Sequence, residues 1–184
     1  ASSAVGFRNK AASENASAVG YGNNANALAA SAVGYNNTAG GVGSSTIGYN
    51  NTATNENASA FGYGNTAGGL ASSAFGFSNT ASGDNANAFG YNNIASGSKS
   101  TVFGTGNTVS GSSSTAVGTA NEVAAENSTA IGNNNTISSG AENSAALGNN
   151  ISISLKDSVA LGNNSTATAI NSVTGNSSYT KWAG

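Results

Sequence analysis

The segment Ser44–Ala53 reads SSTIGYNNTA, and its pattern returns along most of the chain at an interval of fourteen residues. With Gly48 as position 0, position −1 is a large apolar residue, +1 is aromatic, +3 is Asn and +5 is Ala. The same glycine occurs twelve times, with a single sixteen-residue interval, as Gly6, Gly20, Gly34, Gly48, Gly62, Gly76, Gly90, Gly104, Gly118, Gly132, Gly148 and Gly162. A short fixed period indicates a solenoid, in which each repeat is one coil and successive coils stack.

The few large apolar residues are concentrated beside these glycines. Position −1 is always Val, Ile, Phe or Leu, position −2 is Ala in ten of twelve repeats, and eleven of the twelve Phe and Tyr residues adjoin a repeat glycine. A chain this poor in large apolar residues resembles disordered proteins in composition. Disordered chains usually combine that composition with a high net charge, whereas the net charge here is −2. The chain is therefore expected to fold.

Each repeat is predicted to form two short β-strands rather than a helix. Gly, Ser, Asn and Thr are poor helix formers, and fourteen residues leave no room for a capped helix. Positions −3 to +1 alternate as a strand does, and Asn at +3 and Gly or Ser near +7 are predicted to form the two corners. The fold class is therefore all-β, a parallel solenoid of 14-residue coils. Twelve coils stacked about 4.8 Å apart give a rod of roughly 55–60 Å.

The main strand has two apolar faces, and a coil has only one interior. One face carries the large residues at −1 and +1, and the other carries Ala at −2 and the glycine. The pattern leaves open which face looks inward. Because monomers rarely expose long apolar strips, the prediction is a homo-oligomer of cyclic symmetry. In this interpretation the small-residue face, including the glycine, lies at close contacts between chains.

Composition excludes several classes of function. The five Lys and Arg residues are too sparse for a nucleic-acid surface, and no apolar run is long enough to span a membrane. With no His, no Cys and seven scattered carboxylates, the sequence predicts no catalysis, no metal site and no cofactor. The absence of Cys fits a cytosolic protein or an exported one without disulfides. The chain starts without a signal peptide, so it is expected to be a fragment of a longer protein.

The repeat resembles a known family. Ser-x-Ala-Val/Ile/Phe-Gly, followed by Asn-x-Ala, recurs over about residues 1–170 and is similar to the head repeats of trimeric autotransporter adhesins, the YadA-like group of Gram-negative outer-membrane proteins. The resemblance implies a left-handed parallel β-roll, a homotrimer and no enzymatic activity. It also implies display on the bacterial surface above a coiled-coil stalk, with membrane attachment only through an anchor absent from this sequence, and adhesion to host matrix, cells or abiotic surfaces.

The resemblance also suggests a ligand motif. In some members the family motif Asn-Ser-Val-Ala-Ile-Gly is associated with collagen binding, and three stretches here come closest to it: 127–132, 143–148 and 157–162. Collagen, fibronectin and laminin are the implied partners. The N-terminal repeats depart from the motif, with an aromatic residue after the glycine. The candidate ligand-binding residues are Asn127, Ser128, Ile131, Asn143, Ser144, Leu147, Ser158, Val159 and Leu161.

An alternative function, from a different class, is a solenoid that binds ice or polysaccharide through a flat face. It rests on an interrupted column of Thr at position +4, seen for example at Thr38, Thr52 and Thr66.

The repeat has two irregularities. The two extra residues before Gly148 are predicted to lengthen a turn around residues 138–142. Residues 171–184, where the repeat fades, are interpreted as a cap or as the start of a further module.

Overall fold

A computed structural model describes residues 1–168, which form twelve coils, each with a five-residue and a two-residue strand. The expectation for residues 171–184 lies outside the described residues. The five-residue strands are β1 (Ser3–Phe7), β3 (Ser17–Tyr21), β5 (Ser31–Tyr35), β7 (Ser45–Tyr49), β9 (Ser59–Tyr63), β11 (Ser73–Phe77), β13 (Asn87–Tyr91), β15 (Thr101–Thr105), β17 (Thr115–Thr119), β19 (Thr129–Asn133), β21 (Ala145–Asn149) and β23 (Val159–Asn163). The two-residue strands are β2 (Lys10–Ala11), β4 (Asn24–Ala25), β6 (Thr38–Ala39), β8 (Thr52–Ala53), β10 (Thr66–Ala67), β12 (Thr80–Ala81), β14 (Ile94–Ala95), β16 (Thr108–Val109), β18 (Glu122–Val123), β20 (Thr136–Ile137), β22 (Ser152–Ile153) and β24 (Thr166–Ala167).

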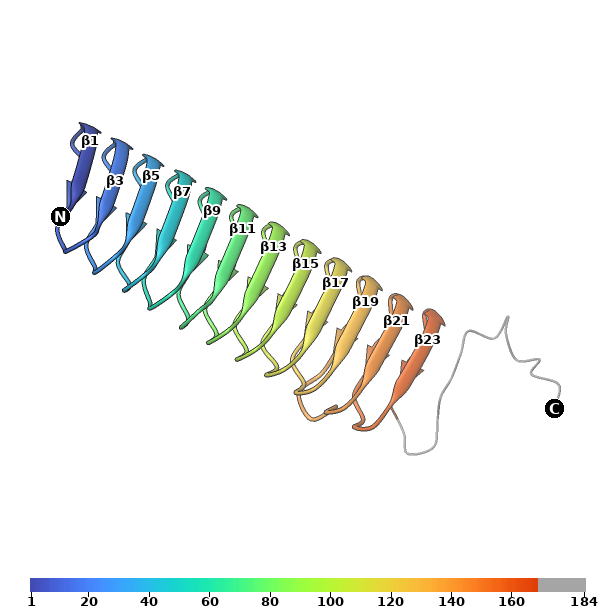
Figure 1. The fold of residues 1–184 in the computed structure, drawn as a ribbon. Helices are drawn as coiled ribbons and strands as arrows, with labels where there is room; N and C mark the ends of the chain where they lie inside the picture. Colours follow the sequence, from blue (N-terminus) through green and yellow to red (C-terminus); the bar gives the residue numbers. More distant parts are fainter. Residues whose placement is uncertain (169–184) are drawn as a thin grey trace, which may run out of the picture.

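The strands form two parallel sheets that run the length of the rod. One sheet contains the twelve odd-numbered strands in chain order (Figure 1), and the other contains the twelve even-numbered strands. The register is strict, so each residue pairs with its counterpart in the next coil; Gly48, for example, pairs with Gly34 and Gly62. The all-β parallel solenoid with a fourteen-residue coil is confirmed.

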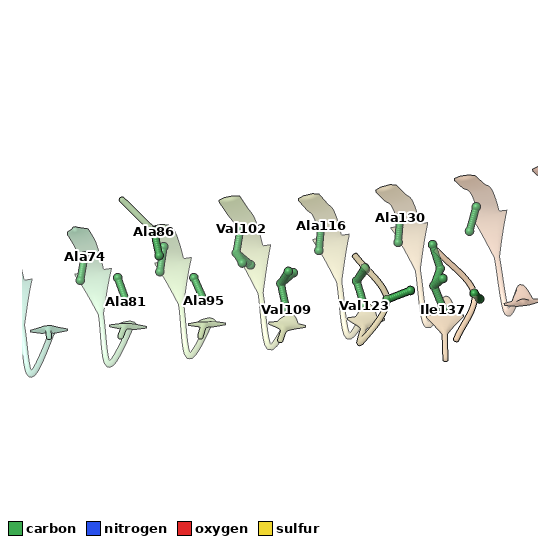
Figure 2. Close-up of a cluster of buried hydrophobic side chains, with 14 of the residues drawn as sticks. Ala74, Ala81, Ala86, Ala95, Val102, Val109, Ala116, Val123, Ala130 and Ile137 are labelled. Atoms are coloured by element: carbon green, nitrogen blue, oxygen red, sulfur yellow. The ribbon is translucent and has the colours of Figure 1, made fainter. Parts of the chain in front are cut away.

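The interior of each coil is narrow and is filled by small residues. Side chains at −2, from the odd-numbered strands, point toward those at +5, from the even-numbered strands, as Ala74 and Ala81 do (Figure 2). Both positions are fully buried throughout most of the rod. The inner residues are mainly Ala in the N-terminal half. Toward the C-terminus they enlarge at Val109, Val123 and Ile137.

The prediction that the small-residue face lies between chains is wrong. Ala18, Ala32 and Ala60 at position −2 have no exposed surface, whereas the large residues at −1 and +1 face outward; Ile47 is 50% exposed. The physical reason is the short distance between the two strands of one coil, which leaves space for Ala but not for Phe or Tyr. The face that remains uncovered in the single chain is therefore the one that carries the large residues.

The repeat glycine is required by its contact with the next coil of the same chain. Gly48 has a φ of +120°, and a Cβ added to it would lie 2.1 Å from the carbonyl oxygen of Gly62. No side chain fits at that distance. The predicted role of the glycine in close contacts between chains is therefore wrong, because the close backbone approach joins successive coils of one chain.

The corners lie near the predicted places but depend on different residues. In the fourteen-residue coils, the non-glycine residues with left-handed backbone fall at two positions. One is +2, for example Asn36 (φ 54°), and the other is +9, for example Asn57 (φ 56°). Asn at +3 is not left-handed, and its side chain is buried. Glycine at +7 serves close packing: a Cβ at Gly69 would lie 2.0 Å from the carbonyl oxygen of Gly83. The corner assignments to +3 and +7 are corrected accordingly.

The predicted longer turn before Gly148 is confirmed and can be placed. Ala141 is buried, as Ala125 is one coil earlier. The Ser128 hydroxyl donates a hydrogen bond to the carbonyl oxygen of Ala141. The Ser114 hydroxyl donates in the same way to the carbonyl oxygen of Ala125. The extra residues are therefore Ser139 and Gly140, both exposed. They widen one turn without disturbing the pairing of β19 with β21.

Candidate functional site

An apolar strip covers the outward face of the odd-numbered strands. We call the −1 and +1 side chains of these strands the outer strip, and most of them are exposed in the single chain. Its most exposed members include Val5, Phe7, Ile47, Tyr91 and Leu161, at 50–60%. Soluble monomers rarely expose a continuous apolar strip of this length, so such a surface marks an interaction site.

Aromatic rings in the outer strip form two stacked columns. At +1 the column runs from Phe7 to Tyr91, and adjacent rings such as Tyr35 and Tyr49 are 4.9 Å apart between centroids with 3° between their planes. At −1 a second column joins Phe61, Phe75, Phe89 and Phe103. The rings of both columns are stacked except at Phe61 and Phe75, which meet edge to face with 66° between their planes.

The outer strip changes its chemistry along the rod. Beyond Tyr91 the +1 residue is no longer aromatic but Thr or Asn, beginning with Thr105 and ending with Asn163. Position −1 stays apolar to the end, at Leu147 and Leu161. The strip is therefore broad and aromatic in the N-terminal half and narrower, with a polar border, in the C-terminal half.

Three of the candidate ligand-binding residues lie together in the outer strip. Ile131 pairs with Leu147, and Leu147 pairs with Leu161, so the three side chains form one ladder on neighbouring strands. Their exposed fractions are 41%, 48% and 57%. This ladder continues the −1 column and is not a separate pocket.

The other candidates separate into exposed corner residues and inward serines. Asn127 and Asn143 are exposed at left-handed corners, and Asn143 Nδ2 donates to Asp157 Oδ1 at 3.0 Å. Val159 is 50% exposed. Ser128 and Ser144 are buried, and each hydroxyl accepts the backbone N–H of the serine one coil further on. The third such serine, Ser158, is half-buried. The serines of the motif thus have a structural role inside the stack.

A buried asparagine ladder was not identified as a structural element from the sequence. Asn65 Nδ2 donates to Asn51 Oδ1, to the carbonyl oxygen of Phe61 and to that of Gly76. The ladder begins at Asn9, which is half-buried in the first coil, and continues with the buried Asn23, Asn37, Asn51, Asn65, Asn79, Asn93, Asn107, Asn121 and Asn135. The invariance of Asn at +3 over ten coils, where neighbouring polar positions vary, was the signal that could have found it.

The opposite sheet presents a polar surface. Thr38, Thr52 and Thr66 at +4 are half-buried on the even-numbered strands, and Ile94 and Glu122 interrupt this column.

Among residues 1–168 there is no group of three His, Cys, Asp or Glu side chains placed to hold a metal ion. Over the same residues, the structure contains no helix of the length and apolarity needed to cross a membrane.

Comparison with known proteins identifies the repeat. No curated protein matches the chain. The family model of the YadA head domain repeat matches residues 1–23, 11–37, 39–65, 67–93, 88–107, 110–135 and 156–173. The unmatched stretch 136–155 contains the inserted Ser139 and Gly140. With most of the chain covered and a regular solenoid of the expected period, this protein belongs to the YadA head repeat family and is an adhesin-like surface module.

Proposed function

We propose that this chain is a non-enzymatic bacterial adhesin head, a left-handed β-roll that assembles into a homotrimer with the outer strips of three chains facing a common axis. The observation that carries the proposal is the exposure of the outer strip in the single chain. Removing apolar side chains from water stabilises association by roughly 25 cal/mol per Å² of buried apolar surface. A strip repeated over twelve coils offers that gain along the whole rod.

The charge distribution supports this choice of face. The outer strip contains no charged side chain at −1 or +1. The acidic residues Glu14, Glu56, Asp84 and Glu126 all lie in the turns that follow the even-numbered strands, and all are exposed. An axis built from the outer strips therefore brings no buried charges together, whereas association through those turns would place like charges close to one another.

Trimer assembly divides the candidate ligand-binding residues by role. Ile131, Leu147 and Leu161 would hold the chains together at the axis. Asn127 and Asn143, at exposed corners, would remain for a ligand, together with the polar face of the even-numbered strands. Three chains and twelve coils present the same groups many times, so weak contacts with a repetitive ligand sum to high avidity. Collagen, fibronectin, laminin, host cells and abiotic surfaces are the targets proposed.

Two measurements test the proposal separately. Light scattering coupled to size exclusion should give three times the chain mass of 17.6 kDa; a folded monomer at micromolar concentration would contradict the trimer. Solid-phase binding to immobilised collagen, fibronectin and laminin, and to bare polystyrene, tests adhesion. The trimer should bind at least one of these surfaces, and less protein should stay bound when the trimer is dissociated into monomers. Binding to none of the surfaces would contradict the adhesin function.

A further inference from the structure

A row of exposed asparagines follows one edge of the rod, at the +2 corner. Asn36, Asn50, Asn134, Asn150 and Asn164 all have left-handed backbone, with φ between 53° and 58°, and all are exposed. A Ser or Thr residue lies two positions after each of these asparagines, at the start of an even-numbered strand. These partners are Thr38, Thr52, Thr136, Ser152 and Thr166. Each corner therefore carries the tripeptide Asn-x-Ser/Thr.

The tripeptide falls only on exposed asparagines. In the asparagine ladder at +3, the residue two positions further on is the inward Ala, Val or Ile of +5, so none of the ten ladder asparagines has the pattern. Every described asparagine followed by Ser or Thr at the second position is exposed. Among the described residues, the buried asparagines of the ladder therefore never carry the tripeptide, and the asparagines that carry it are all exposed.

The corner has room for a large substituent. At Gly106, which occupies the same +2 position, an added Cβ would meet no atom within 4 Å, and at Gly22 the nearest atom is 3.7 Å away. The asparagines form two hydrogen-bonded pairs in which Asn36 Nδ2 donates to Asn50 Oδ1 at 3.0 Å and Asn134 Nδ2 donates to Asn150 Oδ1 at 2.8 Å. In each pair the Nδ2 of the accepting residue, Asn50 or Asn150, makes no hydrogen bond within residues 1–168 and is free to react.

We propose that the +2 corner asparagines, foremost Asn50 and Asn150, are acceptor sites for N-linked glycosylation by a transferase that reads Asn-x-Ser/Thr. In the reaction the side-chain Nδ2 attacks the anomeric carbon of a nucleotide-activated sugar. The N–C bond forms as the bond from that carbon to the phosphate oxygen breaks; the nucleoside diphosphate leaves with the electron pair, and the amide nitrogen loses one proton to a base. No redox change occurs. A row of sugars would then line one edge of the rod.

The chain contains its own matched control. Asn92 occupies the same corner with a φ of 54° and is exposed, but Ile94 replaces the hydroxyl residue. Ile94 is itself exposed, so Ile94→Thr completes the tripeptide without disturbing the interior. In the opposite direction, Thr52→Val removes the hydroxyl beside Asn50 while keeping the asparagine and the β-branched shape. These two variants separate the tripeptide from mere exposure of an asparagine.

The test uses the folded, assembled protein, a soluble N-glycosyltransferase that reads this tripeptide, and UDP-glucose, with intact-mass and peptide mass analysis. We expect whole-hexose additions at Asn50 and Asn150, at least a tenfold loss of occupancy at Asn50 in Thr52→Val, and a new addition at Asn92 in Ile94→Thr. A short peptide containing Asn-Asn-Thr confirms that the enzyme is active. The proposal also requires sugar on these asparagines in protein isolated from the cells that make it. Unmodified native protein, no addition to the folded protein, or equal addition at Asn92 without the hydroxyl would overturn it.

Discussion

The side-chain nitrogen of Asn65 donates a hydrogen bond to the carbonyl oxygen of Gly76, one coil further along the rod, at 2.7 Å. The side-chain oxygen of Asn65 accepts the backbone N–H of Asn79 at 2.9 Å, and Asn65 Nδ2 also reaches Asn51 of the preceding coil. One buried amide therefore connects three coils. It satisfies polar backbone groups at a corner, where the ladder between the strands is interrupted.

Replacing Asn65 with Ala should destabilise the rod by about 1–3 kcal/mol, because buried polar groups of neighbouring coils lose their partner. Thermal and urea unfolding followed by circular dichroism would measure the loss. Ser82→Ala, at an exposed turn position, is the control and should change stability by less than about 0.5 kcal/mol. Equal stability of the two variants would show that the ladder is dispensable.

Replacing Gly76 with Ala should be more damaging. Its φ of +116° alone costs an L-residue about 1–3 kcal/mol, and the added Cβ would lie 2.2 Å from the carbonyl oxygen of Gly90. Asp84→Asn keeps the oxygen that accepts the Leu70 N–H and should be tolerated. Melting temperature and oligomer mass should both fall for Gly76→Ala or Gly76→Val but not for Asp84→Asn. If Gly76→Val melts like the parent protein, the glycine column has no structural role.

Two isoleucines in adjacent columns of the even-numbered strands should respond differently to truncation. Ile137 is fully buried in the coil, whereas Ile94 is 42% exposed. Ile137→Ala removes most of a buried side chain and should destabilise the protein by about 2–5 kcal/mol. For Ile94→Ala we expect less than about 1 kcal/mol, since an exposed position leaves no cavity. Unfolding of the two variants in denaturant, compared by their midpoint concentrations at an unchanged m-value, would measure this difference in stability.

The outer strip can be tested as the trimer contact by introducing charge. Phe103→Glu would place three carboxylates at the proposed axis, so the assembly should dissociate or weaken at least tenfold while the coil keeps its strand content. The matched control is Thr52→Glu, because Glu122 shows that the +4 column accepts a carboxylate and both register partners of Thr52 are uncharged threonines. Mass by light scattering, with circular dichroism as the check on folding, gives the result. A Phe103→Glu protein that stays trimeric would exclude this face from the contact.

Deleting Ser139 and Gly140 together should leave the fold intact. Both residues are exposed, and a Cβ at Gly140 would meet nothing within 4 Å. The deletion restores a fourteen-residue coil, and the change in loop closure entropy is only a few tenths of a kcal/mol. Unfolding curves should nearly coincide with those of the parent. By contrast, deleting Ala141 and Glu142 removes a buried turn residue and should lower the melting temperature.

Much of this architecture could be predicted because it repeats. Each five-residue strand, the parallel register, and the widened turn near residue 140 all follow from the fourteen-residue period and the single sixteen-residue step. The asparagine ladder and the two left-handed corners were harder to predict, since Asn is common both in turns and in buried ladders, and composition does not separate these roles. The same ambiguity affected the candidate site: Ser128 and Ser144 belong to a motif associated with ligands, yet they are buried.

The sequence by itself determined the coil, its length, and the kinds of residue that recur at each position, because stacking identical repeats requires identical residues in register. Only the tertiary structure decided which face looks inward. Strand alternation defines two faces but assigns neither to the interior, and that assignment depends on how closely the two strands of a coil approach. They approach so closely that Ala60 fits between them, whereas Phe61 must lie outside. That distance, which no local pattern encodes, leaves the large side chains on the surface of the single chain.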